Sequence, residues 1–183
     1  LDLIEILTPY PMHAEMTCAA LRSGANVTVQ KPMALSLQEV DSMIEAAHET
    51  GNHLRLYENF LHYPPLIKAK ELMNDGAIGR PLRLRIHMIM GNSQFAWEEE
   101  EASVLWPLEL NRAGHGGVMV LDHGWHIFAV ALWLFGDVRD VFARIDRTAL
   151  PWDGLYMDAP ASMSWRHVDP PVHANYDCTF APE

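Results

Sequence analysis

Three short apolar stretches in the first part of the chain, separated by two stretches of helical periodicity, constrain its fold more than any other feature. The apolar stretches are residues 2–7 (DLIEIL), 26–29 (NVTV) and 53–57 (HLRLY). The helical stretches, residues 12–23 and 37–50, each end before a glycine, which is a common helix stop. Strands that alternate with helices of this length form βαβ units with parallel strands. We therefore predict a parallel α/β sheet.

The second of these helices has a defined start. Ser36 and Glu39 form an S-x-x-E capping box, in which each side chain satisfies a backbone N–H at the helix start. Apolar residues then recur at helical spacing, at Val40, Met43 and Ile44. The sequence therefore predicts a helix over residues 37–50.

The pattern changes after residue 63. A helix is expected over residues 66–75, and residues 81–90 (PLRLRIHMIM) then alternate. The apolar set is Leu82, Leu84, Ile86, Met88 and Met90, and Arg83, Arg85 and His87 lie on the other face. A strand with one polar face is typical of antiparallel sheets. Residues 138–146, 161–168 and 173–180 read as further strands of this kind.

We therefore expect two parts with a boundary near residue 60. Residues 1–60 would be a parallel α/β part. Residues 61–183 would be part of an α+β domain with a mainly antiparallel open sheet. The sequence begins and ends within stretches that read as buried strands, so we expect it to belong to a longer protein.

Charge and cysteine content exclude several classes of partner. The 183 residues carry a formal net charge of -11 and no cluster of lysine or arginine. Nucleic acid and anionic membrane surfaces both require basic patches, so we expect neither partner. No apolar run is long enough for a membrane span, and no signal peptide is visible. Cys18 and Cys178 lie far apart and indicate a reducing, cytoplasmic compartment rather than a disulfide framework.

Each predicted strand of the parallel sheet is followed by a polar or proline-containing corner. The corners are Thr8-Pro9, Gln30-Lys31-Pro32 and Glu58-Asn59. Ligands of open parallel sheets bind outside the carboxyl ends of the strands, which predicts a site at this edge. A partly desolvated lysine gives up its proton readily and can act as an acid or base. Taken alone, Lys31 is also explained as a surface lysine at a strand end.

A second candidate site lies in residues 113–136 (AGHGGVMVLDHGWHIFAVALWLFG). Gly116 and Gly117 allow a close approach of the backbone, and Asp122 and His126 are four apart, so they share a helix face. Asp122 could orient a proton-transferring His126. Two other interpretations stay open: a metal site that includes His123, or a helix cap beside a buried histidine. The acidic run Glu98–Glu101 is expected to be a solvated loop.

Three stretches in order resemble the Gfo/Idh/MocA family of oxidoreductases. The stretch LTPYPMHAEMTCAALRSGANVTVQKPM is similar to the family's T-P-x-x-x-H turn and the Glu-Lys-Pro corner that follows it. YENFLHYPPLIKAKELMNDGAIGRPLRLRI is similar to the crossing segment, with an asparagine after the strand and a G-x-I-G turn. GGVMVLDHGWH resembles the G-G-x-x-x-x-D-x-G-x-H helix.

The resemblance implies that residues 1–60 are the C-terminal part of a Rossmann-type parallel sheet, without its glycine-rich first βα unit. It also implies an enzyme that moves a hydride between NAD or NADP and a hydroxyl-bearing carbon of a sugar, cyclitol or similar polyol. It implies Lys31, Asp122 and His126 as catalytic residues, with either Lys31 or His126 as the base. The residues implied to line the cofactor are Thr8, Pro9, His13, Gln30, Lys31, Pro32 and Asn59. It also implies a small-molecule substrate and a homo-oligomer, a dimer or tetramer. The loop 94–112 is expected to help shape the substrate site.

Two features depart from the family pattern. Gln30 replaces the glutamate before the lysine, so Lys31 has one negative charge fewer beside it. The G-x-G-x-x-G phosphate fingerprint is absent, and the residue that separates NAD from NADP is absent with it. Two other classes of function therefore stay open. One is a truncated, non-enzymatic homologue that acts as an association module, and the other is a small metal-dependent protein using residues 122–126.

Overall fold

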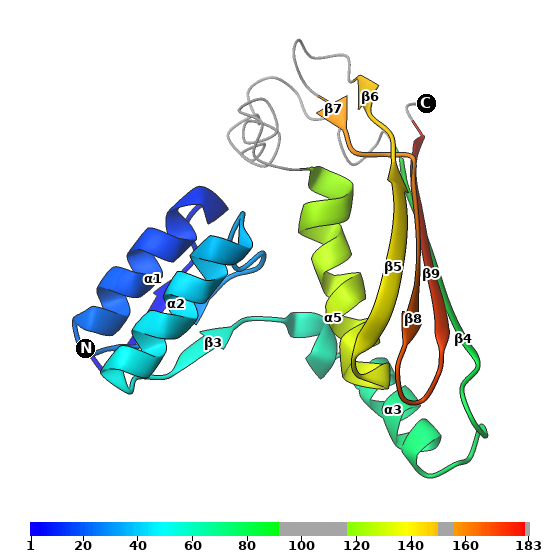
Figure 1. Cartoon of the computed structure of the whole chain (residues 1–183), viewed down its shortest axis with the longest axis horizontal. Coiled ribbons are helices and arrows are strands. Elements are labelled where there is room, and N and C mark those ends of the chain that lie inside the picture. Colours follow the sequence, from blue (N-terminus) through cyan, green and yellow to red (C-terminus); the bar gives the residue numbers. More distant parts are fainter. Residues whose placement is uncertain (92–116, 150–155, 182–183) are drawn as a thin grey trace. The chain divides into compact units, whose positions relative to one another are not determined.

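A computed structural model describes residues 1–91, 117–149 and 156–181 of the chain. The chain divides into two compact units, Leu1–Glu58 and Asn59–Glu183, and each is described by itself (Figure 1). The acidic run at residues 98–101 and the loop 94–112 lie outside the described residues. No helix among the described residues is long and apolar enough to cross a membrane.

The first unit is a three-stranded parallel sheet with two packed helices, as the sequence predicts. The strands β1 (Leu3–Ile6), β2 (Asn26–Val29) and β3 (Leu54–Leu56) lie in the order β1-β2-β3. Helix α1 (His13–Arg22), preceded by the short turn η1 (Tyr10–Met12), and helix α2 (Leu37–Thr50) make the two connections and lie side by side (Figure 1). In register, Ile6 lies beside Val29 and Val29 beside Leu56, so all three strands end at one edge.

The start and end of α2 agree with the predicted range of residues 37–50. The Glu39 amide donates to the Ser36 hydroxyl over 3.2 Å, and the Glu39 carboxylate accepts from the Ser36 amide over 3.0 Å. Gly51 ends the helix at a φ of 70°, a left-handed conformation that glycine adopts without steric cost. The signals for both ends are local, which explains why the sequence alone predicts them.

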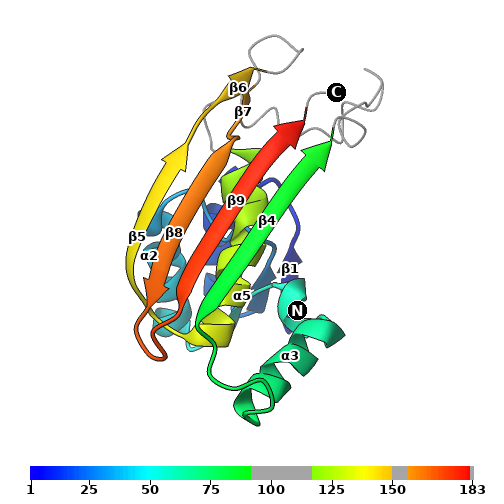
Figure 2. The same cartoon turned by 90° about the vertical axis from the view of Figure 1, so that its right-hand side faces the viewer.

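The second unit combines helices with a four-stranded sheet. Its first part holds η2 (Asn59–His62), α3 (Pro64–Asn74) and β4 (Arg83–Gly91). A π-helical turn, η5 (Val118–His123), then leads directly into α5 (Gly124–Phe135). The remaining strands are β5 (Val138–Ile145), β6 (Thr148–Ala149), β7 (Tyr156–Met157), β8 (Ala161–His167) and β9 (His173–Ala181). The large sheet has the order β4-β9-β8-β5 (Figure 2), and β6 and β7 form a separate pair.

The large sheet is mixed, although most of its pairings are antiparallel as predicted. Strands β5 and β8, and β8 and β9, pair antiparallel, whereas β4 and β9 pair parallel over nine positions. Alternation of polar and apolar residues shows that one face of β4 is buried, but it carries no information on strand direction. Several elements, from η5 to β8, lie between β4 and β9 in the sequence, and a parallel pair requires such a long connection rather than a hairpin.

The core of the second unit lies between α5 and one face of the sheet. Its buried members include Ile127 and Ala131 from α5, Met163 and Trp165 from β8, and Tyr176 from β9. Leu84, Ile86 and Met88 of β4 pack against this cluster, as the alternation predicts. Leu82 departs from the prediction: it precedes the strand and is 67% exposed.

Candidate active site

The first two predicted corners lie at the carboxyl edge of the parallel sheet. Thr8 and Pro9 follow β1, and Gln30, Lys31 and Pro32 follow β2. The backbone links the corners to the strands, because the Gln30 amide donates to the carbonyl of Ile6 over 3.0 Å. Lys31 is half-buried here. The structure thus places a lysine and several polar groups where ligands of parallel sheets bind.

The side chain of His13 links the backbones of these two corners. Its Nε2 lies 2.8 Å from the carbonyl oxygen of Thr8, and its Nδ1 lies 2.9 Å from that of Pro32. The side chain is 1% exposed. Carbonyl oxygens only accept hydrogen bonds, so the imidazole must donate to at least one of them. The ring atoms of His13 thus brace the backbone of both corners, and its expected role in lining the cofactor stays a prediction.

The side chain of Gln30 braces the corner that carries Lys31. Its amide oxygen Oε1 accepts a hydrogen bond from the Lys31 amide over 2.9 Å. The Lys31–Pro32 peptide bond is cis. A glutamate at position 30 could accept the same bond, so the change to glutamine preserves the shape of the corner while removing a charge.

In the second unit, Asp122 and His126 lie at the start of one continuous helix. Asp122 is in the π-helical turn η5, where its amide donates to the carbonyl of Gly117 over 3.3 Å, and His126 is in the first turn of α5. Asp122 is 7% exposed, which is unusual for a carboxylate. Wide π-helical turns are frequently found at functional sites. Asp122 therefore lies in the wide turn and His126 in the regular helix that directly follows it.

The ring of His126 stacks on the ring of Phe60. The ring centroids are 4.2 Å apart and the planes are inclined by 10°. Phe60 comes from η2, the short helix that begins with Asn59, another residue implied to line the cofactor. The stack fixes the plane of the imidazole, and Phe60 is a site residue that the sequence pattern did not indicate.

Asp122 has a second histidine beside it. Its Oδ2 lies 3.6 Å from Nδ1 of His123, a pair that is ionic only when the imidazole is protonated. Among the described residues, no group of three histidine, cysteine or acidic side chains could hold a metal ion.

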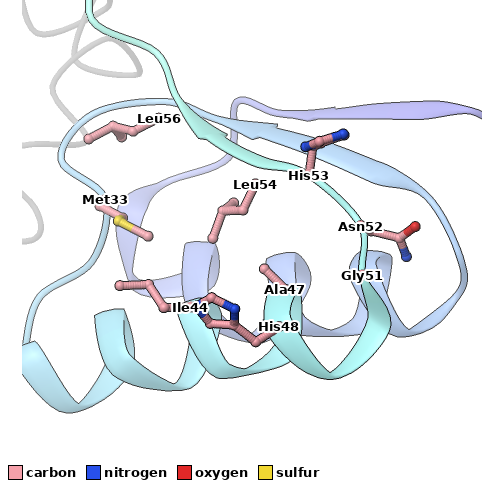
Figure 3. A pocket seen from close by; sticks show the side chains of 9 residues that line it. All are labelled: Met33, Ile44, Ala47, His48, Gly51, Asn52, His53, Leu54 and Leu56. Carbon is pink, nitrogen blue, oxygen red and sulfur yellow. The ribbon is translucent and has the colours of Figure 1, made fainter.

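Two hollows of the surface contain none of the candidate catalytic residues. The first, of about 530 Å³, lies between α2 and β3, where Ile44, Ala47 and His48 face Leu54 (Figure 3). The second, of about 410 Å³, lies beside the helix start and includes Trp125, Tyr156 and Asp158 in its wall. The candidate catalytic residues therefore lie outside these two hollows, at a corner of the first unit and at the helix start of the second.

Comparison with known proteins identifies the family of the chain. Residues 1–58 match the family model described as "Oxidoreductase family, NAD-binding Rossmann fold", and residues 66–181 match the "GFO/IDH/MocA C-terminal domain". The chain belongs to the GFO/IDH/MocA oxidoreductase family. The resemblance seen in its motifs is thereby confirmed, as is the fold class, with a Rossmann-type sheet followed by a mixed sheet.

Named relatives of this family act on sugars and cyclitols. The chain is 30% identical to D-apiose dehydrogenase of Paraburkholderia graminis over 147 residues, which are 80% of this chain and 36% of that protein. It is 26% identical to a scyllo-inositol 2-dehydrogenase (NADP(+)) of Bacillus subtilis over 147 residues, 79% of this chain and 38% of the relative. The chain thus spans well under half the length of these relatives.

Solved structures of the family share the fold. An oxidoreductase from Agrobacterium radiobacter in complex with NAD+, L-tartaric acid and magnesium superposes with a TM-score of 0.81 at 22% identity. The match covers 100% of this chain and 49% of that one. Myo-inositol 2-dehydrogenase from Lactobacillus plantarum gives a TM-score of 0.77 at 23% identity, covering 99% of this chain and 52% of that one.

Proposed function

We propose that this chain supplies the proton-transfer residues of an NAD(P)-dependent oxidoreductase that acts on a secondary alcohol or carbonyl of a sugar, cyclitol or similar polyol. The observation that carries the proposal is the braced corner at the carboxyl edge, where His13 and Gln30 fix the backbone on either side of Lys31. Sugar and inositol dehydrogenases among the relatives support the substrate class.

The polar groups at this edge fit a nicotinamide cofactor. The hydroxyl oxygen of Thr8 is buried and has no hydrogen-bond partner among the described residues. Buried hydroxyls are almost always hydrogen-bonded, so an orphaned one at this edge fits a polar ligand. Thr8, Pro9, His13, Gln30, Lys31, Pro32 and Asn59 would line NAD or NADP, and the bound cofactor would supply the hydride acceptor. The described residues contain no G-x-G-x-x-G turn to hold the pyrophosphate.

The proposed chemistry is a proton transfer at the substrate hydroxyl. When the alcohol is oxidised to a carbonyl, its carbon loses a hydride and its oxygen loses a proton. Either Lys31 or His126 takes this proton, since lysine and histidine side chains both serve as general acids and bases in enzymes. Asp122 orients the histidine and balances the charge that develops on it. Each residue matches the family motif at its own position: K-P for Lys31 and D-x-G-x-H for Asp122 and His126.

Domain roles, assembly and compartment complete the proposal. Residues 1–60 are the later part of a dinucleotide-binding domain, and residues 61–183 are part of a domain for substrate binding and dimerisation. Both cysteines are free thiols, half-buried at Cys18 and buried at Cys178, which suits the reducing cytoplasm. The proposed enzyme works in the cytoplasm as a homo-oligomer. Size-exclusion chromatography with light scattering would test the oligomeric state by measuring the mass in solution.

A substrate panel tests the proposed function. The full reading frame that contains these residues is purified and mixed with NAD+ or NADP+ and with cyclitols, aldoses and sugar acids, and the absorbance of the reduced nicotinamide is followed. Turnover with at least one polyol supports the proposal. Cofactor binding without turnover on any polyol would contradict the substrate class. Neither binding nor turnover would favour the alternative of a non-enzymatic association module.

A further inference from the structure

Gly117 and Asp158 lie unusually close together in the second unit. A Cβ atom added to Gly117 would lie 1.9 Å from Oδ2 of Asp158 and 2.0 Å from its Cγ. The φ of Gly117 is -112°, which any residue can adopt, so the backbone conformation does not require glycine. Glycine is needed here because the carboxylate of Asp158 occupies the space beside it. The second glycine of the G-G pair therefore has a structural reason that the sequence does not reveal.

The carboxylate of Asp158 binds the start of the helix. Its Oδ1 accepts a hydrogen bond from the Met119 amide, and its Oδ2 accepts one from the Val120 amide, each over 2.7 Å. The first amides of a helix have no partner within the helix, and a negative charge beside them is also favoured by the helix dipole. Hydrogen bonds to an ionised carboxylate are about twice as strong as neutral ones. Asp158 thus caps η5 from a distant part of the chain.

Asp158 is itself held rigidly on both sides. Its neighbours Met157 and Ala159 are fully buried in the same core cluster as Met119. The hydroxyl of Thr148 also donates to the carbonyl of Ala159 over 2.6 Å. A side chain fixed in this way can set the position of the backbone that it binds.

The segment that Asp158 binds leads directly to the candidate proton-transfer residues. The amide of Asp122 closes the same wide turn on the carbonyl of Gly117. His126 follows one helical turn later. We propose that Asp158 is a positioning residue, which places Asp122 and His126 for proton transfer by fixing the helix start in the space that Gly117 leaves. This inference rests on the proposed function, and Asp158 itself does not touch the reacting atoms.

The variant Asp158→Asn tests the inference, with Asp140→Asn as its matched control. In Asp158→Asn the side-chain amide turns a donor toward one of the two helix amides, so one hydrogen bond and the charge are lost. Asp140 also accepts two hydrogen bonds, from Nε and Nη2 of Arg166, but it lies on the exposed strand β5. The control therefore removes a comparable carboxylate from the same unit without changing the helix start.

Two readouts are taken on the full reading frame. In steady-state kinetics, Asp158→Asn is expected to lower kcat about 10- to 100-fold and to change KM by no more than about twofold, because misplaced reacting groups affect the transition state most. In NMR spectra, the Met119 and Val120 amide signals should move upfield and the His126 ring signals should shift. Asp140→Asn should change neither kcat nor these NMR signals.

The outcomes separate this inference from the proposed function. A kcat for Asp158→Asn within twofold of the wild type, or unchanged His126 ring signals, would overturn the positioning role. If Asp158→Asn does not fold, Asp158→Glu keeps the charge but moves the carboxylate by one methylene, and the same two outcomes apply to it. A wild-type protein without activity would contradict the proposed function, and the His126 ring signals would still decide the role of Asp158.

Discussion

The imidazole of His126 lies face to face on the ring of Phe60, with their centroids 4.2 Å apart. A candidate base whose ring plane is fixed in this way can receive a proton only along a narrow range of directions. The stack therefore connects η2, at the start of the second unit, with the helix that carries the proposed chemistry.

Phe60→Leu should reduce turnover by removing the stacking partner of His126. Aromatic pairs contribute about 0.5–1.5 kcal/mol beyond their burial, which corresponds to a loss in kcat of roughly 2- to 12-fold. Phe60→Tyr keeps the ring and should retain most of the activity. Steady-state kinetics measures both variants, and equal activity in Phe60→Leu and the wild type would show that the stack has no part in catalysis.

Lys31→Met should abolish most turnover while cofactor binding persists. General acid–base groups contribute about 10²- to 10⁴-fold, and a loss of this size in kcat is expected if Lys31 transfers the proton. Lys68→Met is the control, because Lys68 is an exposed lysine on α3 paired with Glu71. If Lys31→Met retains more than half of the wild-type kcat, Lys31 is not the base, and His126 becomes the candidate to test.

His13→Ala should destabilise the first unit. It leaves a cavity and removes the bonds to the carbonyls of Thr8 and Pro32, so we expect a loss of about 2–4 kcal/mol in the free energy of unfolding. Urea denaturation followed by circular dichroism measures this free energy of unfolding. His48→Ala, at an exposed position on α2, should change stability by less than about 0.5 kcal/mol. Similar stabilities for the two variants would disprove the bracing role of His13.

The ion pair between Asp140 and Arg166 gives a pH-dependent stability. The hydrogen bond from Arg166 lowers the pKa of Asp140 below its ordinary value, and Arg139 and His173 act in the same direction. The folded state therefore gains stability from this carboxylate above its unfolded pKa of about 3.9, and the gain is lost as the pH falls through the lower folded value. The difference in urea midpoint between the wild type and Asp140→Asn should be present at neutral pH and shrink toward zero in acid. A difference that is independent of pH would contradict this.

The two cysteines should differ in reactivity. Burial raises the pKa of the Cys178 thiol, so little thiolate forms, whereas Cys18 is half-buried on α1. A thiol-specific reagent should label Cys18 quickly in the native protein. It should label Cys178 on the order of 100-fold more slowly, or only after unfolding. Cys18→Ser should remove the fast phase. Two equally fast phases in the wild type would show that the sheet around Cys178 opens readily.

The sequence predicts those features whose causes are local. The range of α2 follows from its capping box and Gly51, and the half-burial of β4 follows from its alternation. The candidate residues Lys31, Asp122 and His126 could be selected because a family motif surrounds each of them. The parallel pairing of β4 with β9 could not be predicted, since no residue within either strand encodes the direction of its neighbour.

Contacts between distant parts of the chain account for what the sequence missed. Phe60 reads as an ordinary apolar residue after a strand, and only the fold brings it onto His126. Asp158 follows a two-residue strand and binds amides 38 and 39 positions earlier in the chain. Gly117 was only partly predictable. A glycine pair before a helix indicates that some group approaches the backbone closely, but it does not identify Asp158 as that group.

Titration of tryptophan fluorescence with NADH and NADPH tests the central claim most directly. It is made on these 183 residues and on the full reading frame that contains them, with six tryptophans as the reporters. We predict saturable quenching by one or both cofactors in the full reading frame, and weaker or no binding by the 183 residues, since they contain no G-x-G-x-x-G turn. If the full reading frame shows no quenching and no binding of either cofactor, the proposal of a nicotinamide-dependent oxidoreductase is wrong.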